Sequence, residues 1–223
     1  MKDNNLILVT GATGAVGPRV VSALHEAGHR VRTLSLDAPP AGAWLEAVDA
    51  RLGDITDPAA VQTAMVGVDG VIHLAALLHI INPPPELRSR YERINVGGTA
   101  NVVEAARQAG VGRVVFFSTI AVYGASAGSV LTEASPLRPD SFYAQTKVDA
   151  ERIVLAAKRA DGTPMGTVLR LGAVYGARIK GNYRRLLLSL ARGRFIPIGA
   201  GNNRRTLVYD KDVARAAALA LSH

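Results

Sequence analysis

The chain has 223 residues, of which 48% are hydrophobic, and it carries a formal net charge of +8 at pH 7. That length suits one sizeable α/β domain with a buried core. The lack of cysteine excludes disulfides, thiolate metal sites and cysteine nucleophiles. No apolar run approaches the roughly 20 residues that cross a bilayer. The polar residues 1–5 leave no room for a signal peptide, so we expect a soluble, cytoplasmic protein without membrane contact.

The positive charge is concentrated in the last quarter of the chain. A basic patch of this kind is typical either of a nucleic-acid surface or of arginines that bind a phosphorylated small ligand. Few aromatic residues lie between these charges and no nucleic-acid module signature occurs, which favours the small ligand over nucleic acid. The basic residues are Arg178, Lys180, Arg184, Arg185, Arg192, Arg194, Arg204 and Arg205.

The first motif is LILVTGATGAVG, residues 6–17, in which Gly11, Gly14 and Gly17 recur every three residues. A short apolar run that ends in glycine is typical of a strand buried on both faces, and a helical pattern then continues to Gly28. We expect Gly11 to allow a tight turn, Gly14 to let the backbone approach phosphates, and Gly17 to let the helix pack closely on its strand. With the helix N-terminus beside them, the glycines predict a pyrophosphate site rather than a merely structural turn.

Apolar runs and helical patterns alternate along the whole chain. This alternation predicts an α/β fold with a Rossmann-type, doubly wound parallel sheet. Helices are expected to end at Gly28, to begin at Pro58 with Asp57 as its cap, to span 87–108, and to begin near Ser141, with a short helical piece at 44–48. Strands are expected at 6–9, 30–36, 47–52, 70–74, 112–118 and 167–171.

The end of the second strand bears on the choice of dinucleotide. An acidic residue there favours NAD, whereas a nearby arginine favours NADP. Asp37 lies at the expected distance beyond Gly17, yet Ser35 occupies the position seven residues past Gly28. Counting from Gly17 leads to an acidic residue, whereas counting from Gly28 leads to a serine, so NADP stays open as the cofactor. NAD is favoured because no arginine follows Ser35 directly. Asp54, at the end of the third strand, is a candidate acceptor for an adenine amine.

A second motif, SFYAQTK, places Tyr143 and Lys147 four residues apart, so they share one face of a helix. An ammonium beside a phenol favours the phenolate and lowers its pKa, which would let Tyr143 exchange a proton with a hydroxyl. A tyrosine and a lysine at this spacing are more often an exposed pair on a helix without a catalytic role. Thr119, at the end of the fifth strand, reverses that preference, since ligand-facing side chains lie at strand ends in open α/β sheets.

In this order, GATGAVG, Asp54-Ile55, HLAA, NVGGTAN, FFSTIAVYG and YAQTK resemble an extended short-chain dehydrogenase/reductase of the NAD-dependent epimerase/dehydratase family. The resemblance runs through essentially the whole chain. It implies that Thr119, Tyr143 and Lys147 form the catalytic group and that no metal is involved. Together, the residues and the resemblance predict dinucleotide contacts at Gly11, Gly14, Ala15, Val16, Gly17, Ser35, Asp37, Asp54, Ile55, Leu74, Ala75, Ala76, Asn95, Ser118, Tyr143 and Lys147.

The same resemblance implies a nucleotide-sugar substrate, held by Thr119, Asn182 and Arg205. Among family members, the KGN and NNRR segments resemble 4-epimerases and 4-keto-sugar reductases, so we expect hydride transfer at C4 of a UDP-hexose. Ile120 and Ala121 follow Thr119 where the dehydratases carry acidic residues, which argues against dehydration. Alternatives are a 4-keto-sugar-nucleotide reductase, a dehydrogenase of a sterol or aldehyde, and a non-catalytic dinucleotide sensor.

The resemblance also implies how the chain is divided. Residues 1–175 would form the dinucleotide-binding domain. Residues 176–223 would form part of a smaller substrate lobe, interleaved with the last strand and helix of the core. We expect this lobe to be incomplete, since the chain stops at His223 inside a helical pattern. By analogy with the family, the helices at 87–108 and from Ser141 would form a homodimer interface.

Overall fold

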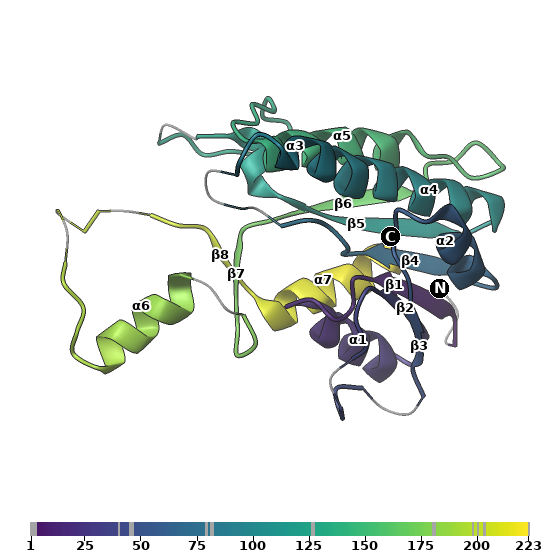
Figure 1. Ribbon diagram of the computed structural model, residues 1–223, viewed down its shortest axis with the longest axis horizontal. Helices are drawn as coiled ribbons and strands as arrows, with labels where there is room; N and C mark the ends of the chain where they lie inside the picture. Colours follow the sequence, from purple (N-terminus) through teal and green to yellow (C-terminus); the bar gives the residue numbers. More distant parts are fainter. Residues whose placement is uncertain are drawn as a thin grey trace.

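The computed structural model describes residues 4–39, 41–44, 47–78, 80, 83–125, 128–179, 182–197, 199, 201–202 and 204–222. Their main feature is a parallel sheet of six strands in the order β3-β2-β1-β4-β5-β6 (Figure 1). The predicted doubly wound sheet is therefore confirmed. The strands are β1 Leu6–Thr10, β2 Arg30–Ser35, β3 Asp49–Leu52, β4 Gly70–His73, β5 Arg113–Thr119 and β6 Gly166–Leu171.

The central strand β1 is buried along all five residues because helices cover both faces of the sheet. Successive side chains of a strand point to opposite faces. Leu6 and Leu8 pack on one face, in the cluster that includes Val61 of α2, whereas Ile7 and Val9 pack on the other. The run LILV therefore supplies both halves of the core.

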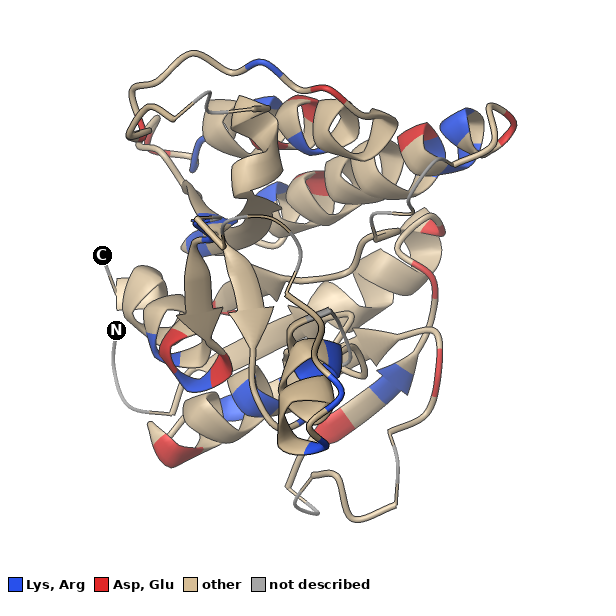
Figure 2. Cartoon of the chain, turned by 90° about the vertical axis from the view of Figure 1, so that its left-hand side faces the viewer, with Lys and Arg blue, Asp and Glu red and all other residues tan. Residues whose placement is uncertain are grey.

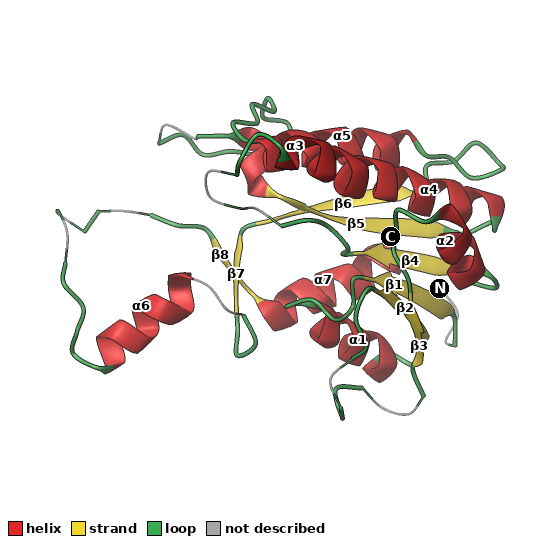
Figure 3. Cartoon of the chain, viewed as in Figure 1, coloured by secondary structure: helices red, strands yellow, loops and turns green. Residues whose placement is uncertain are grey.

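The helices divide into two layers, which Figures 1 and 3 show above and below the sheet. The helices α2, α4 and α5 cover one face, whereas α1 and α7 pack together on the other. Asp57 caps α2 and Ser141 caps α5 through side-chain hydrogen bonds to backbone N–H groups, as the sequence predicted for Asp57. The bounds are α1 Gly17–Glu26, α2 Pro58–Met65, α4 Gly98–Gln108, α5 Phe142–Ala156 and α7 Asp210–Ser222.

Two local predictions need correction. The helix expected at 87–108 is divided into α3 Leu87–Tyr91, the π-helix η1 Glu92–Gly97 and α4. Residues 44, 47 and 48 of the expected helical piece form bends and a turn, and residues 45 and 46 lie outside the described part. The strand ends differ from the predicted ones by one or two residues.

The chain after β6 leaves the main sheet. Strand β7 Ala173–Tyr175 pairs in parallel with β8 Leu207–Tyr209, and helix α6 Asn182–Ala191 lies between them in sequence. In Figure 1, α6 stands apart from the rest of the chain. None of the helices in the described ranges has the length and apolar character that crossing a membrane requires.

The topology fixes where a ligand site belongs. From β1 the chain builds outward through β2 and β3, and then returns to β4 on the other side of β1. Ligands bind outside the carboxyl ends of the strands at such a switch point. In register, Thr10 of β1 pairs with Leu34 of β2 and with His73 of β4, so the loops after these strands meet at one edge.

Candidate active site

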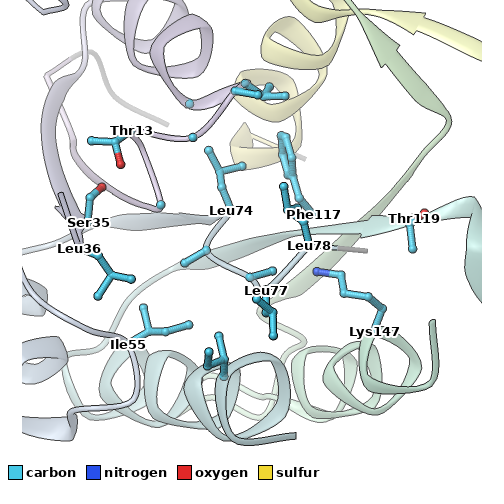
Figure 4. Close-up of a pocket in the computed structure, with 18 of the residues that line it drawn as sticks. Thr13, Ser35, Leu36, Ile55, Leu74, Leu77, Leu78, Phe117, Thr119 and Lys147 are labelled. Atoms are coloured by element: carbon cyan, nitrogen blue, oxygen red, sulfur yellow. The ribbon is translucent and has the colours of Figure 1, made fainter. Parts of the chain in front are cut away.

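A cavity of about 450 Å³ lies at the carboxyl edge of the sheet. Its lining combines the glycine loop, the ends of β2, β4 and β5, and helix α5. Figure 4 shows Ser35, Leu36 and Ile55 on one side, and Thr119 and Lys147 on the other. Of the predicted contacts, the lining includes Gly11, Gly14, Ala15, Val16, Gly17, Ser35, Asp37, Asp54, Ile55, Leu74, Ala75, Ala76, Ser118, Thr119, Tyr143 and Lys147.

The glycine loop is shaped by two close approaches of the backbone. Gly11 has a φ of 67°, and a Cβ there would lie 2.7 Å from the backbone of Ala75. A Cβ on Gly17 would lie 2.1 Å from the carbonyl oxygen of Ala12. Side chains at both positions would therefore displace backbone. The roles predicted for Gly11 and Gly17, a tight turn and close helix packing, agree with these distances.

The first turn of α1 faces the cavity without a side-chain cap. Val16 occupies the N-cap position and makes no side-chain hydrogen bond to the helix, and Gly17 and Val16 both line the cavity. Helix N-terminal N–H groups have no partner within the helix and carry the positive end of its dipole. This turn can hold an anionic group such as a pyrophosphate.

The β2 side of the cavity offers polar groups beside Leu36 and Ile55, and strand β2 contributes no basic side chain to the lining. The hydroxyl of Ser35 is buried and makes no hydrogen bond within the described structure. Asp37 also lines this side, and Asp54 accepts a hydrogen bond from the backbone N–H of Thr56 at 2.8 Å. These groups offer a ribose or a base hydrogen-bond partners, and the unpaired hydroxyl of Ser35 fits such a ligand.

The other end of the cavity carries the predicted catalytic group. Tyr143 and Lys147 are on α5, and Thr119 is the last residue of β5. The hydroxyl of Thr119 accepts a hydrogen bond from the N–H of Ala121 at 3.1 Å, which begins the short 3₁₀ helix η2 Ile120–Tyr123. The Nζ of Lys147 lies 3.9 Å from the centroid of the Phe116 ring, a cation–π geometry.

Burial controls the protonation of this group. It raises the pKa of Tyr143 to about 12, with a smaller contribution from Tyr91. Burial likewise lowers the pKa of Lys147 to about 7, and the charge of Glu151 opposes that shift. For the chain alone, desolvation of the phenol thus outweighs the lowering of its pKa that the sequence led us to expect from Lys147.

Asn95 does not line the cavity; it holds a loop that does. Its Oδ1 accepts from the N–H of Leu77 at 2.7 Å, and its Nδ2 donates to the carbonyl of Leu77 and to Oγ1 of Thr146, both at 3.1 Å. Thr146 in turn donates to the carbonyl of Tyr143 at 2.9 Å. Ser118 lines the cavity, but its hydroxyl donates to the carboxylate of Glu151.

Sequence reasoning missed part of the lining. Leu77 and Leu78 directly follow the HLAA segment, and Phe117 directly precedes Ser118. Their closeness in sequence to predicted contacts was the signal that could have identified them as lining residues. Arg90 and Ile94 come from the segment predicted as one long helix. The missed residues are Thr13, Leu34, Leu36, Gly53, Leu77, Leu78, Arg90, Ile94, Phe117, Leu171, Gly172 and Val174.

Of the predicted substrate contacts, Thr119 lines this cavity and Arg205 does not. Arg205 lines a second cavity of about 720 Å³ between β7 and α6, together with Arg184 and Tyr175. Val174 lines both cavities, so the two are neighbours. Asn182 begins α6, and its side chain lies outside the described part of the structure. Figure 2 views the molecule from the α6 side, where basic residues lie in several places with acidic ones between them.

Comparison with known proteins decides the family. The model of the NAD dependent epimerase/dehydratase family matches residues 7–223. The chain belongs to this family. The resemblance seen in the sequence motifs is therefore confirmed. Its relatives include both epimerases and dehydrogenases.

The relatives differ in the reaction that their names record. A 3 beta-hydroxysteroid dehydrogenase/Delta 5-->4-isomerase of Mycobacterium tuberculosis is 33% identical, over 97% of this chain and 60% of its own length. The N-acetyl-alpha-D-glucosaminyl-diphospho-ditrans,octacis-undecaprenol 4-epimerase of Escherichia coli O157:H7 is 32% identical, over 94% and 60%. The chain therefore spans about 60% of the length of these curated relatives.

A solved structure gives the same picture of the fold. MoeE5 in complex with UDP-glucose and NAD is 34% identical and matches with a TM-score of 0.83, over 99% of this chain and 72% of its own. The likeness covers the sheet, the glycine loop and the segment that contains α6.

Proposed function

We propose that this chain binds NAD in the first cavity and transfers hydride to and from C4 of a UDP-hexose, as a UDP-glucose 4-epimerase does. One observation carries the proposal. Tyr143, Lys147 and Thr119, which come from a helix and a strand end far apart in sequence, line the same cavity as the glycine loop. A proton-transfer group and a phosphate-binding turn in one cavity suit a dinucleotide-dependent oxidation of a hydroxyl.

The residues present fit a dinucleotide. The uncapped start of α1 suits a pyrophosphate, and the unpaired, buried hydroxyl of Ser35 suits a ribose. NAD is favoured over NADP because Asp37 lines this side, and a carboxylate disfavours a 2′-phosphate. When bound, NAD supplies a nicotinamide ring that accepts and returns hydride.

Each catalytic side chain then has one task. Tyr143 takes the proton from the C4 hydroxyl as hydride leaves that carbon, and returns it in the reverse step. Lys147 lines the same end of the cavity, where its ammonium favours the phenolate of Tyr143 and would hold the nicotinamide ribose of a bound NAD. Thr119 orients the substrate hydroxyl. Return of hydride to the opposite face of C4 would invert that carbon, whereas uptake of NADH and release of NAD would give net reduction of a 4-keto sugar.

The second cavity supports a sugar nucleotide. Its two arginines, Arg184 and Arg205, can bind a diphosphate, since a planar guanidinium matches two phosphate oxygens. The rings of Tyr175 and Tyr183, 5.5 Å apart between centroids, add an apolar surface for a base or sugar. MoeE5, at 34% identity, was solved with UDP-glucose and NAD, which supports the same pair of ligands here.

A second candidate is the oxidation of a 3β-hydroxysteroid. It is favoured by the 33% identity to the mycobacterial 3 beta-hydroxysteroid dehydrogenase/Delta 5-->4-isomerase. The loop after β4 contributes Leu74, Leu77 and Leu78 to the first cavity, and these side chains could contact a sterol. The arginines of the second cavity have no task in that reaction, which is why we rank it second.

Ligand binding and turnover separate the two candidates. The purified protein is first tested for NAD, and then offered UDP-glucose, UDP-N-acetylglucosamine, a 4-keto derivative and a 3β-hydroxysteroid. We expect UDP-glucose to raise the melting temperature and to be inverted at C4. A melting shift and NADH formation with the steroid alone would select the dehydrogenase. NAD binding without turnover of any of them would contradict both and indicate a sensor.

A further inference from the structure

A buried ionic network lies one helical turn below Lys147. Glu151 is four residues further along α5 and is only 1% exposed. Its carboxylate binds the guanidinium of Arg170, from Nη2 at 2.7 Å and from Nε at 3.1 Å to each oxygen. It also accepts the hydroxyl proton of Ser118 in a hydrogen bond. A buried ion pair is weak evidence for stability, because desolvation offsets much of its Coulombic attraction.

Arg170 connects the network to a third and a fourth segment. It lies on β6 directly opposite Ser118 of β5 in the strand register. Its Nη1 donates to the hydroxyl of Tyr123 at 2.7 Å and to the carbonyl of Glu133 at 3.2 Å. The bidentate contact with Glu151 raises the pKa of Arg170, so the guanidinium stays charged. The network therefore fixes α5 against β5 and β6 through three side chains.

Lys147 is coupled to this network through the charge of Glu151. On its own helix it is flanked by Tyr143 and Glu151. From the sheet it faces His73 of β4, which burial and the charge of Lys147 keep neutral by lowering its pKa to about 3, and Arg170 of β6 beyond Glu151. Tyr91 of α3 contacts Tyr143, with ring centroids 6.5 Å apart. Asp149 is nearer in sequence, but two residues along a helix it does not share the face of Lys147, and it pairs with Arg152. Glu151, one turn away, is the carboxylate on the face of Lys147.

The burial of Lys147 makes that charge matter. The side chain is 2% exposed, and its desolvation favours the neutral amine. The carboxylate of Glu151 opposes this, and its interaction is weakly screened in the interior. An ammonium is the form that favours the phenolate of Tyr143. The charge state of Lys147 at neutral pH thus depends on a residue outside the cavity.

We propose that Glu151 is a positioning residue that holds α5 against β5 and β6 and, through its carboxylate, keeps Lys147 in the ammonium form. Arg170, which pairs with Glu151, weakens the effect of that carboxylate on Lys147. The inference rests on the proposed function for its use in catalysis, but not for the electrostatic effect itself. Glu151 does not line the cavity, so it acts on the reaction through Lys147 and Ser118.

Two charge-neutralising variants give opposite predictions. Glu151→Gln removes the attractive charge and leaves Arg170, so it should lower the pKa of Lys147 by about one pH unit or more. Arg170→Gln leaves the carboxylate without its partner, so it should raise the pKa of Lys147 by a similar amount. A merely structural role predicts that both variants loosen α5 and shift the pKa in the same direction, or not at all.

The measurement is a pH titration of the Lys147 side chain by NMR of its ¹³Cε signal in the protein without added cofactor, assigned with Lys147→Met. Ser118→Ala is the matched control, because it removes a hydrogen bond of Glu151 but no charge, and it should move the pKa by less than half as much as Glu151→Gln. If Glu151→Gln does not fold, the upward shift in Arg170→Gln decides. Equal shifts in both charge variants, or none, overturn the proposal.

The pH profile of turnover links this result to catalysis. The alkaline limb should move to lower pH in Glu151→Gln and to higher pH in Arg170→Gln. If the NMR shifts appear but no sugar nucleotide is turned over, the proposed function fails and the electrostatic inference stands. If turnover is present and the NMR shifts are absent, the inference alone fails.

Discussion

The sheet with its two helix layers and the segment from β7 to β8 differ in how their apolar residues are used. On α1, Leu24 is fully buried, whereas on α6 Leu187 is 49% exposed and Leu190 is 50% exposed. Both helices are amphipathic in sequence, yet only α1 packs against a second helix and the sheet. An amphipathic pattern predicts that a helix forms; whether it is buried depends on what the rest of the chain places beside it. The glycine loop and the catalytic group lie in the first region, and the arginines lie in the second.

The largest contrast should come from trimming one leucine in each region. Leu24→Ala opens a cavity in a packed core and should lower the free energy of unfolding by about 3 kcal/mol. Leu187→Ala removes a half-exposed side chain and should change it by no more than about 0.5 kcal/mol. Chemical denaturation measures both. Equal losses would show that α6 is packed as tightly as α1.

A glycine pair sharpens the same comparison. Gly17→Ala forces a Cβ against the carbonyl of Ala12 and should cost about 2 kcal/mol, with loss of NAD affinity because α1 must move. Gly193, after α6, has a φ of 62° and open space around its Cα, so Gly193→Ala should cost about 1 kcal/mol through backbone strain alone. Thermal unfolding and NAD titration test both. A Gly17→Ala protein that binds NAD normally would contradict the close packing.

A smaller effect is expected at Asn95, which joins the cavity loop to α5. Asn95→Ala leaves the N–H and carbonyl of Leu77 without this partner and should cost about 1.5 kcal/mol. Its KM for NAD should rise more than its kcat falls, because the loop and not the chemistry is loosened. Asn101→Ala, which removes one bond to the carbonyl of Ile55, is the control, at about 1 kcal/mol. A loss of kcat alone would assign Asn95 to the reaction itself.

The parts of the fold that were predictable depend on neighbours in sequence. The run LILV before the glycines predicted β1 and its burial, and spacing alone placed Tyr143 and Lys147 on one face of a helix. The π-turn at η1 was not predictable, because it coincides with Asn95, whose side chain is held by Leu77 and Thr146 at distant positions. π-Helical turns inside α-helices are frequently found at functional sites.

In the site, too, the residues predicted from nearby sequence differ from those that meet only in the folded chain. The glycine loop, residues 74–76 after β4, and Ser118 and Thr119 at the end of β5 were predicted as site residues, and they line the cavity. The ion pair of Glu151 and Arg170 was missed, since these residues meet only where helix α5 packs against strand β6. Arg205 was predicted from the resemblance of its segment to the family, and it lines the second cavity; its role with a diphosphate stays a prediction.

The central claim is that Tyr143 carries the proton while the glycine loop holds the dinucleotide. Tyr143→Phe removes one hydroxyl from the cavity and leaves that loop unchanged. We expect the variant to bind NAD within about twofold of the original affinity and to turn over its sugar nucleotide about 10³-fold more slowly, as loss of a general base predicts. Binding is followed by calorimetry and turnover by the C4 epimer formed. Unchanged turnover in Tyr143→Phe would contradict the account.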